Sequence, residues 1–271
     1  MNPTSSSSQS FGQSYTRIRL LGEGGYGSVF LVRRIADGSL YAAKVIHDTK
    51  CTKKSYCRRR GALVPDEILL TENLSHSNLI IPEHIYFEGG WWIIVMDYLP
   101  GYVDLFDHLS DSGALSVEIT RAIISQLVDV TCYLITMGID HRDIKDENIL
   151  FNPSTRHMKL IDFGSAGRIP APGVPYTSFR GTEVYLPPQY FLSGTYLALP
   201  AITWTIGCLA YALLNGDRPF ATPQEVASYR YLSFLNPRLD QGSKVFLHEL
   251  LDRDEDDRML PQEISTHPWL L

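Results

Sequence analysis

The sequence is poor in cysteine: Cys51, Cys57, Cys132 and Cys208 are the only four among 271 residues. Their spacing matches neither a metal-ligand pattern nor a redox motif, so it favours neither structural zinc nor a disulfide framework. We expect reduced thiols in a cytoplasmic or nuclear protein. Positive charge is not in excess either, because the net charge is −6, and we therefore expect no nucleic-acid partner.

One long uncharged stretch of the sequence lacks an unbroken apolar run long enough to cross a membrane. Residues 184–216 carry no charge, and their second half is strongly apolar, but Pro187, Pro188 and Pro200 interrupt the stretch. A spanning helix needs about 20 consecutive apolar residues, so we expect a buried central helix here and no membrane partner. Residues 1–10 are rich in serine without the apolar core of a signal peptide, and we assign residues 1–14 to a disordered tail.

Residues 141–148 (HRDIKDEN) place a carboxylate, an ammonium group and an amide at spacings of two and three residues, and Asp-Phe-Gly follows at 162–164. Phosphoryl transfer needs a group that accepts the substrate hydroxyl proton, a cation near the phosphoryl group and oxygen ligands for magnesium. In the general scheme for such enzymes, Asp143 is the catalytic base and Lys145 the catalytic cation. Asn148 and Asp162 are then the ligands of Mg²⁺. Each short pattern also occurs by chance, so their order along the chain decides.

A glycine-rich segment lies upstream. Gly22, Gly24 and Gly27 with Val29 form the pattern G-x-G-x-x-G-x-V between two apolar stretches, which predicts strand, glycine turn and strand. A dinucleotide-binding fold would instead place a helix directly after the third glycine. The next apolar run, residues 41–46, is typical of a third strand and carries Lys44.

The glycine loop, the strand lysine, the loop at 141–148 and Asp-Phe-Gly follow one another in the order typical of protein kinases. The predicted fold class is therefore α+β, a bilobal protein kinase fold with a β-rich N-lobe and an α-helical C-lobe. We place the kinase domain at residues 15–271, with the N-lobe at about 15–96, a hinge at 97–103 and the C-lobe at 104–271. The hinge contains Pro100 and Gly101, which suit a linker.

Lys44 lies within an apolar strand, where a buried ammonium group is costly unless it is paired. Glu67 is the expected partner, because it begins an apolar pattern with Leu70 and Leu74 that predicts a helix packed on the strand. The pair would let Lys44 hold the phosphates of ATP. The alternative is a surface lysine whose stem lies along the sheet.

ATP and Mg²⁺ are the expected cofactors. The adenine edge would pair with the backbone carbonyl of Asp97 and the amide of Leu99. Val29 and Ala42 would cover the ring and Leu150 would lie under it. Core packing is the alternative for these three apolar side chains, and it explains Val29 and Leu150 equally well. The predicted ATP-binding residues are Leu21, Gly22, Glu23, Gly24, Gly25, Tyr26, Gly27, Ser28, Val29, Ala42, Lys44, Glu67, Asp97, Leu99 and Leu150.

Over residues 15–271 the chain resembles the Pim family of protein kinases, in the CAMK group, with the PAS-domain kinases as near relatives. The most specific matching segments are 104–107 (DLFD), 141–150 (HRDIKDENIL), 159–166 (KLIDFGSA) and 267–269 (HPW). Lys145 and Thr182 match the serine/threonine pattern, with dual specificity as the alternative. The resemblance implies a kinase that favours basic substrates and needs no phosphate on its activation loop.

Four acidic side chains, those of Asp104, Asp107, Asp146 and Glu147, are expected beside the catalytic base. They could bind arginine residues that precede the acceptor of a protein substrate. A solvated acidic rim is the alternative. We expect the kinase to be a monomer whose partners are protein substrates with Arg or Lys upstream of the serine or threonine.

Several positions depart from the usual kinase pattern. Gln189 replaces a glutamate that normally pairs with an arginine, here expected to be Arg258, and its amide can still accept a hydrogen bond. Ile202 stands where many kinases have an aspartate that braces the catalytic loop. Leu99 replaces the linker proline of Pim proteins and restores a backbone donor, and Asp140 occupies a usually apolar position.

A basic segment precedes Glu67; its residues are Lys50, Lys53, Lys54, Arg58, Arg59 and Arg60. We favour a solvated loop over a nuclear-import or phosphate-docking patch. The competing function is a pseudokinase scaffold, which the presence of Lys44, Asp143 and Asp162 argues against. A small-molecule kinase is disfavoured by the peptide-binding pattern at 181–188.

Overall fold

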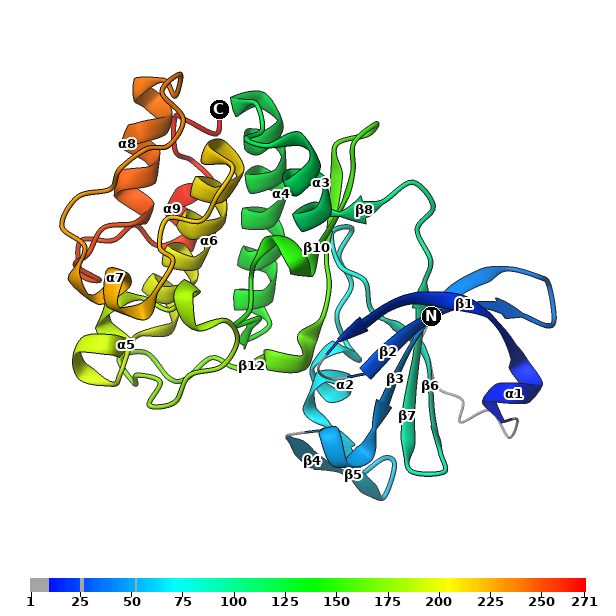
Figure 1. The fold of residues 1–271 in the computed structure, drawn as a ribbon. Helices are drawn as coiled ribbons and strands as arrows, with labels where there is room; N and C mark the ends of the chain where they lie inside the picture. The colour runs from blue at the N-terminus through cyan, green and yellow to red at the C-terminus, as the bar shows by residue number, and fades with distance from the viewer. Residues whose placement is uncertain (1–9, 25–26, 52) are drawn as a thin grey trace. The chain divides into compact units, whose positions relative to one another are not determined.

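The structure, a computed structural model, describes residues 10–24, 27–51 and 53–271. Contacts divide the chain into an N-terminal unit, residues 1–75 and 80–100, and a C-terminal unit, residues 76–79 and 101–271. Where described, the N-terminal unit is mainly strand and the C-terminal unit mainly helix, which confirms the predicted α+β class (Figure 1).

The N-terminal unit is built on a five-stranded antiparallel sheet with the strand order β1-β2-β3-β7-β6. Its strands are β1 (Tyr15–Gly24), β2 (Gly27–Arg34), β3 (Leu40–His47), β6 (Pro82–Glu88) and β7 (Trp91–Asp97). Successive side chains of a strand point to opposite faces. Val45 and Val95 belong to the core cluster of one face, and Ile46 and Ile94 to that of the other.

A short helix, α1 (Phe11–Ser14), belongs to the first of these clusters through Phe11, which is 6% exposed and stacks on Tyr15. The expected disordered tail over residues 1–14 is therefore wrong for residues 11–14, because one buried aromatic side chain anchors them. Residues 1–9 lie outside the described part of the chain. The second cluster is completed by Ile68 of α2 (Asp66–Thr71).

The basic segment forms η1 (Asp48–Lys50), the hairpin of β4 (Lys54–Cys57) and β5 (Ala62–Pro65), and the turn between these two strands. Several of its cations have acidic partners within the same unit. Lys54 pairs with Asp48 over 2.7 Å, and Arg59 and Arg60 pair with the two carboxylate oxygens of Glu72. These pairs favour the solvated-loop interpretation, because the cations are already partly neutralised.

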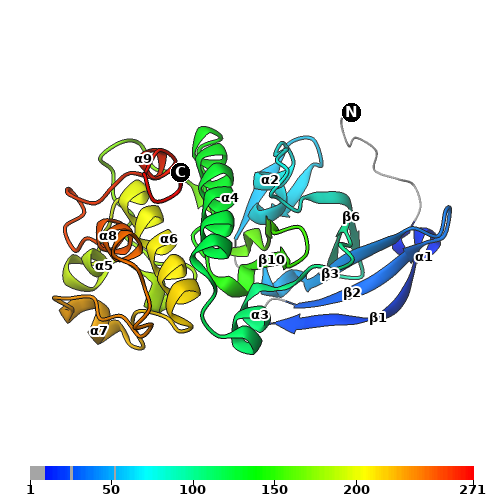
Figure 2. The ribbon, with the colours of Figure 1, turned by 90° about the horizontal axis from the view of Figure 1, so that it is seen from above.

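The C-terminal unit is organised around α6, against which α4, α8 and α9 pack (Figure 2). Its helices are α3 (Leu105–Ser112), α4 (Val117–Thr136), α5 (Pro188–Ser193), α6 (Ala198–Asn215), α7 (Pro223–Ser228), α8 (Gln241–Leu250) and α9 (Pro261–Ile264). Two helices, α4 and α6, are long and apolar enough to span a membrane by length and composition. In α6, 89% of the apolar stretch is buried within the protein, which confirms the predicted central buried helix.

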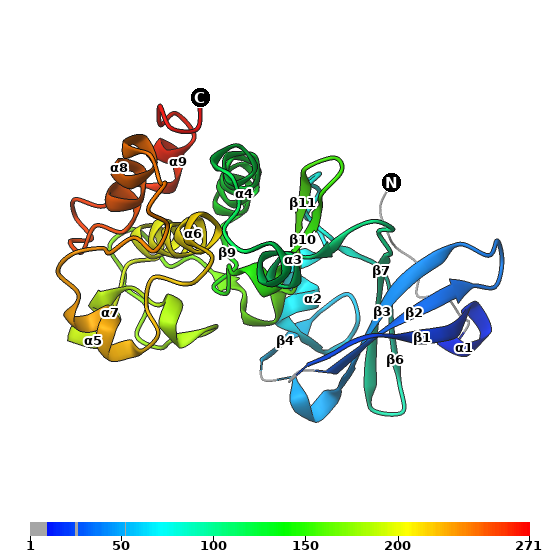
Figure 3. The same ribbon diagram turned by 45° about the horizontal axis from the view of Figure 1, so that its top comes forward.

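Two small sheets hold the loops that carry the predicted catalytic residues (Figure 3). One has the order β11-β10-β8 and the other pairs β9 with β12. These strands are β8 (Val103–Asp104), β9 (Ile139–Asp140), β10 (Ile149–Asn152), β11 (His157–Leu160) and β12 (Gly167–Arg168). The loop at 141–148 leaves β9 and ends in the single turn η2 (Asp146–Asn148) before β10. Asp162 follows two residues after β11.

Candidate active site

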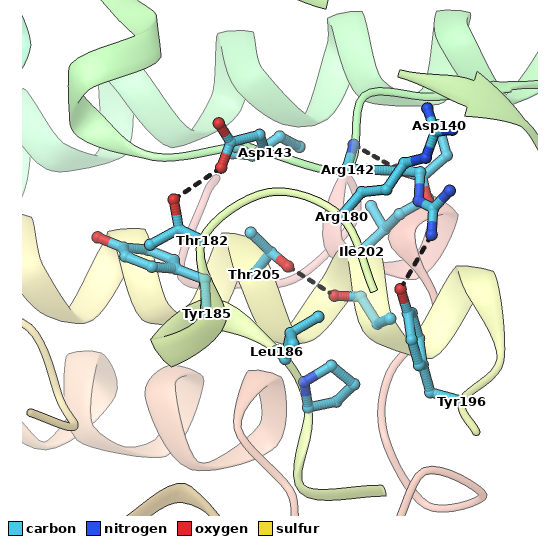
Figure 4. Close-up of a pocket in the computed structure, with 13 residues that line it drawn as sticks. Asp140, Arg142, Asp143, Arg180, Thr182, Tyr185, Leu186, Tyr196, Ile202 and Thr205 are labelled. Atoms are coloured by element: carbon cyan, nitrogen blue, oxygen red, sulfur yellow. Dashed lines mark hydrogen bonds between the residues drawn. The ribbon is translucent and has the colours of Figure 1, made fainter. Parts of the chain in front are cut away.

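Asp143 accepts hydrogen bonds on both carboxylate oxygens, and Figure 4 shows the one from Thr182. The hydroxyl of Thr182 donates to Oδ1 over 2.8 Å, and Nδ2 of Asn148 donates to Oδ2 over 2.9 Å. Lys145 Nζ donates to the same Thr182 hydroxyl over 2.9 Å and lies 3.8 Å from Asp143 Oδ2. Two predicted site residues, Lys145 and Asn148, therefore surround this carboxylate together with Thr182.

Gly181 makes the approach of Thr182 to Asp143 possible. Its φ of +83° lies in the left-handed region that glycine adopts without penalty. A Cβ atom at this position would overlap the backbone oxygen of Arg142 and crowd the Asp143 side chain. The Gly181-Thr182 pair seen in the sequence thus has a steric basis.

The ammonium group of Lys145 also pairs with Glu147 Oε2 over 2.7 Å. Burial lowers the pKa of Lys145, but the hydrogen bond to Glu147 and the charge of Asp143 more than offset burial, so the pKa lies above its ordinary value. Lys145 is therefore a cation at neutral pH.

Asn148 and Asp162 lie on adjacent segments, because the amide of Ile161 donates to the backbone oxygen of Asn148 over 3.0 Å. Nδ2 of Asn148 is used by Asp143, which leaves its side-chain oxygen for another ligand. Asp162 has a left-handed φ of +62°, and its Oδ1 accepts from Gly164 N over 3.0 Å. In the described part of the chain, no three His, Cys, Asp or Glu side chains form a metal-binding cluster. An Asn–Asp oxygen pair nevertheless suits Mg²⁺, which takes its other ligands from phosphates and water.

Lys44 and Glu67 form the predicted ion pair within the N-terminal unit. Lys44 Nζ lies 2.9 Å from Oε1 and 3.2 Å from Oε2 of Glu67. Their side chains are only 11% and 16% exposed. The surface-lysine alternative is therefore wrong: the carboxylate offsets the cost of placing an ammonium group in an apolar strand.

The other predicted ATP-binding residues occupy known elements, except that Gly25 and Tyr26 lie outside the described residues. Leu21, Gly22, Glu23 and Gly24 are in β1, Gly27, Ser28 and Val29 in β2, Ala42 in β3, Asp97 at the end of β7, Leu99 just after it, and Leu150 in β10. Gly27 is required sterically, because a Cβ atom there would overlap the carbonyl oxygen of Val45.

The four acidic residues lie on two elements that pack together, α3 with its N-cap and η2. Asp104 caps α3, accepting from the amide of Phe106 over 2.9 Å. Burial, with smaller contributions from the charges of Asp107 and Asp146, raises the pKa of Asp104 to about 6. Burial and the charge of Glu147 raise the pKa of Asp146. The carboxylates are thus close enough to disfavour one another's charge.

Residues 15–270 match the family described as protein kinase domain. The chain belongs to the protein kinase family. The kinase is similar to serine/threonine-protein kinase pim-2 of Danio rerio, with 34% identity over 96% of this chain and 86% of that protein. It is 31% identical to serine/threonine-protein kinase prk-2 of Caenorhabditis elegans, over 96% of this chain but only 59% of that protein. Death-associated protein kinase 2 of Mus musculus is 31% identical over 92% and 70% of the two chains. The predicted resemblance to Pim kinases is confirmed.

Gln189 of the kinase makes the predicted contact with Arg258. Its Oε1 accepts from the guanidinium over 3.1 Å, while its Nε2 donates to the backbone oxygen of Arg253 over 2.6 Å. Arg258 is 3% exposed and also donates to the backbone oxygens of Asp252 and Pro200. Burial lowers its pKa to about 10. A neutral amide and backbone carbonyls thus take the place of a carboxylate.

The sequence did not reveal how the kinase holds Arg142, whose guanidinium lies over the ring of Tyr176 and donates to the hydroxyl of Tyr196. Asp140 could be found only as a charged residue at a usually apolar position. Nothing in the sequence marked Tyr176 or Tyr196, because their contacts join segments more than 30 residues apart.

Proposed function

We propose that the kinase transfers the γ-phosphate of ATP to serine or threonine hydroxyls of protein substrates. The observation that carries this proposal is the hydrogen bond of Asp143 with a hydroxyl group: Thr182 lies 2.8 Å from the carboxylate that would accept the proton of the acceptor. A general base must lie within about 2.6–3.2 Å of the group from which it takes a proton. The names of the similar proteins, two of them serine/threonine-protein kinases, support the acceptor class.

Each remaining residue has a part in the proposal. Lys145 would neutralise the oxygens of the transferred phosphoryl group, since its ammonium group lies beside Asp143. Lys44, held by Glu67, would bind the ATP phosphates, and the backbone of residues 21–29 would cover them. Asn148 and Asp162 would hold Mg²⁺, which when bound neutralises charge on the phosphates.

We further propose that the acidic residues at Asp104, Asp107, Asp146 and Glu147 select substrates with arginine upstream of the acceptor. Burial, and to a smaller extent repulsion between the carboxylates, raises the pKa of Asp104 and Asp146, and a guanidinium would offset both effects. Glu147 would contribute less to arginine binding than the other three, because its carboxylate already pairs with Lys145.

We propose a monomer that acts in the cytoplasm or nucleus, without nucleic-acid or membrane partners. The pseudokinase alternative is disfavoured because the ion pair of Lys44 and the hydrogen bonds of Asp143 are formed. The test is incubation of the purified kinase with ATP, Mg²⁺ and an oriented peptide library, with the Asp162→Asn variant as control. We expect phosphoserine and phosphothreonine preceded by arginine. Phosphotyrosine alone, or no transfer above the Asp162→Asn background, would contradict the proposal.

A further inference from the structure

Asp140 is a buried carboxylate at the usually apolar position before His141. It is 5% exposed and lies at the end of β9, where its backbone pairs with Gly167 of β12. Its Oδ1 accepts from the amide of Arg142 over 3.0 Å, and its Oδ2 accepts from the hydroxyl of Tyr176 over 3.2 Å. The carboxylate therefore links the loop that carries the base to the activation segment, residues 162–189.

Arg142 completes this link. Its left-handed φ of +63° turns the loop at the residue before Asp143. The guanidinium lies 4.2 Å from the centre of the Tyr176 ring and donates to the backbone oxygen of Ser178 over 2.9 Å. It also donates to the hydroxyl of Tyr196 over 3.3 Å, and Tyr196 in turn pairs through its backbone with Tyr176. We call this set of contacts the Asp140 network; its members are Asp140, Arg142, Tyr176 and Tyr196.

Three side chains that face Asp140 favour or sense its charge. These are Arg142 from its own loop and Tyr176 and Tyr196 from the activation segment and the chain that follows it. Arg180 lines the same pocket (Figure 4), whereas Arg168 of the pairing strand β12 donates to the backbone oxygen of Met137. Burial raises the pKa of Asp140 to about 6, although Arg142 and the hydrogen bonds oppose the rise. At neutral pH the network thus contains an ionised carboxylate and a guanidinium.

In many kinases, phosphorylation orders the activation segment because the new phosphate pairs with arginine. Here the guanidinium of Arg142 already donates to the backbone oxygen of Ser178. Ser178 lies four residues before Thr182, whose hydroxyl donates to Asp143. Arg142 and Thr182 also line one pocket beside Asp143 (Figure 4).

We propose that Asp140 is a positioning residue whose carboxylate, by accepting from the amide of Arg142 and from the hydroxyl of Tyr176, holds residues 176–182 against the catalytic loop without phosphorylation. The proposal rests on the proposed function for its effect on catalysis. The geometric part, that Asp140 orders residues 176–182, is independent of it.

Two variants test the proposal. Asp140→Asn keeps the shape of the side chain and removes its charge, and Tyr176→Phe keeps the ring under Arg142 and removes the hydroxyl. Asp111→Asn, at an exposed position in α3, is the matched control. Each phosphatase-treated protein is compared in hydrogen exchange of residues 176–182, in kcat and KM for peptide and ATP, and in thermal midpoint.

We expect Asp140→Asn to exchange residues 176–182 at least several-fold faster and to lose about tenfold in kcat, with KM for ATP unchanged. Because a raised carboxylate pKa means that ionisation costs stability above about pH 6, its thermal midpoint should equal or exceed that of the wild type. Tyr176→Phe should show the same effects to a smaller extent.

Unchanged exchange and rate in Asp140→Asn would overturn the proposal, and so would a loss of rate that merely follows a lower thermal midpoint. If the wild type transfers no phosphate at all, the proposed function fails. The exchange of residues 176–182 in Asp140→Asn and Asp111→Asn still decides the role of Asp140 in that case.

Discussion

A hydroxyl group shared between a base and a cation is the central feature at the scale of single residues. Thr182 donates to Asp143 and accepts from Lys145, so one side chain fixes the distance between the two proposed catalytic groups. The substrate hydroxyl would need the same two interactions. Thr182 thus holds Asp143 and Lys145 in place, and it shows that the site can bind a hydroxyl group.

Thr182→Val should lower kcat for peptide about 10- to 100-fold, because hydrogen bonds to charged groups contribute about 1.5–3 kcal/mol. KM for ATP should stay within about twofold of the wild type. Thr182→Ser, which keeps the hydroxyl, is the control and should retain most activity. Steady-state kinetics of the three proteins would contradict this account if the valine variant equalled the serine variant.

Asp104 should make arginine selection dependent on pH. Its pKa of about 6 means that the carboxylate is charged at pH 7.5 and largely protonated at pH 5.5. The ratio of kcat/KM for an arginine-containing peptide to that for its alanine analogue should therefore fall as the pH drops through 6. Added salt should also reduce the ratio, because the groove is partly exposed.

Asp104→Asn should show a lower ratio of these kcat/KM values at pH 7.5 with little further change on acidification, whereas Asp111→Asn should behave as the wild type. A ratio independent of pH, salt and the Asp104 substitution would mean that the carboxylates form only a solvated rim.

Single residues were predictable where elementary energetics demanded a partner. Lys44 in an apolar strand needed a carboxylate, and Glu67 lies in α2, the next α-helix along the chain. Gln189 and Arg258 could be paired because the kinase pattern places a contact there. No energetic argument assigned a partner to Tyr176, since a tyrosine between two turns is compatible with many environments.

At the scale of secondary-structure elements, the C-terminal unit depends on α6 and on the buried arginine beside it. Arg258 comes from the loop between α8 and α9, yet it donates to Pro200 of α6 and to Gln189 of α5. Its guanidinium also lies 5.0 Å from the centre of the Trp204 ring. One side chain therefore ties three parts of the unit together.

Gln189→Ala should destabilise the kinase by about 1–3 kcal/mol, because it leaves a buried guanidinium N–H without its acceptor and removes the nearer of two donors to the Arg253 carbonyl. The thermal midpoint should fall by roughly 2–4 °C for each kcal/mol. Gln224→Ala, at an exposed position of α7, is the control and should change the midpoint little. Equal midpoints for both variants would show that the Gln189 contact adds no stability.

Elements with a strong apolar pattern were predictable and short ones were not. The uncharged stretch before Asp217 predicted the buried helix α6. Serine-rich composition concealed α1, whose order depends on Phe11 stacking on Tyr15 and packing edge to face on Tyr86. Four residues are too few for helical propensity or periodicity to show in the sequence.

At the scale of the whole molecule, the proposed reaction draws on both units. Lys44, Glu67 and the glycine-rich segment belong to the N-terminal unit, and Asp143, Lys145, Asn148 and Asp162 to the C-terminal unit. The order of these motifs along the chain was enough to predict the fold, because no other common fold combines them in this sequence. Phosphate binding and proton transfer should therefore be separable by substitution.

The most direct test of the account is to measure phosphate transfer and ATP binding together in Asp143→Asn. The amide keeps the shape of the side chain but cannot accept a proton, so we predict that transfer to peptide falls by about 10²- to 10⁴-fold. ATP affinity, measured in the same preparation with Mg²⁺, should remain within a few-fold of the wild type, whereas Lys44→Met should also reduce nucleotide binding. Turnover near the wild-type rate in Asp143→Asn, with ATP bound normally, would contradict the assignment of Asp143 as the base.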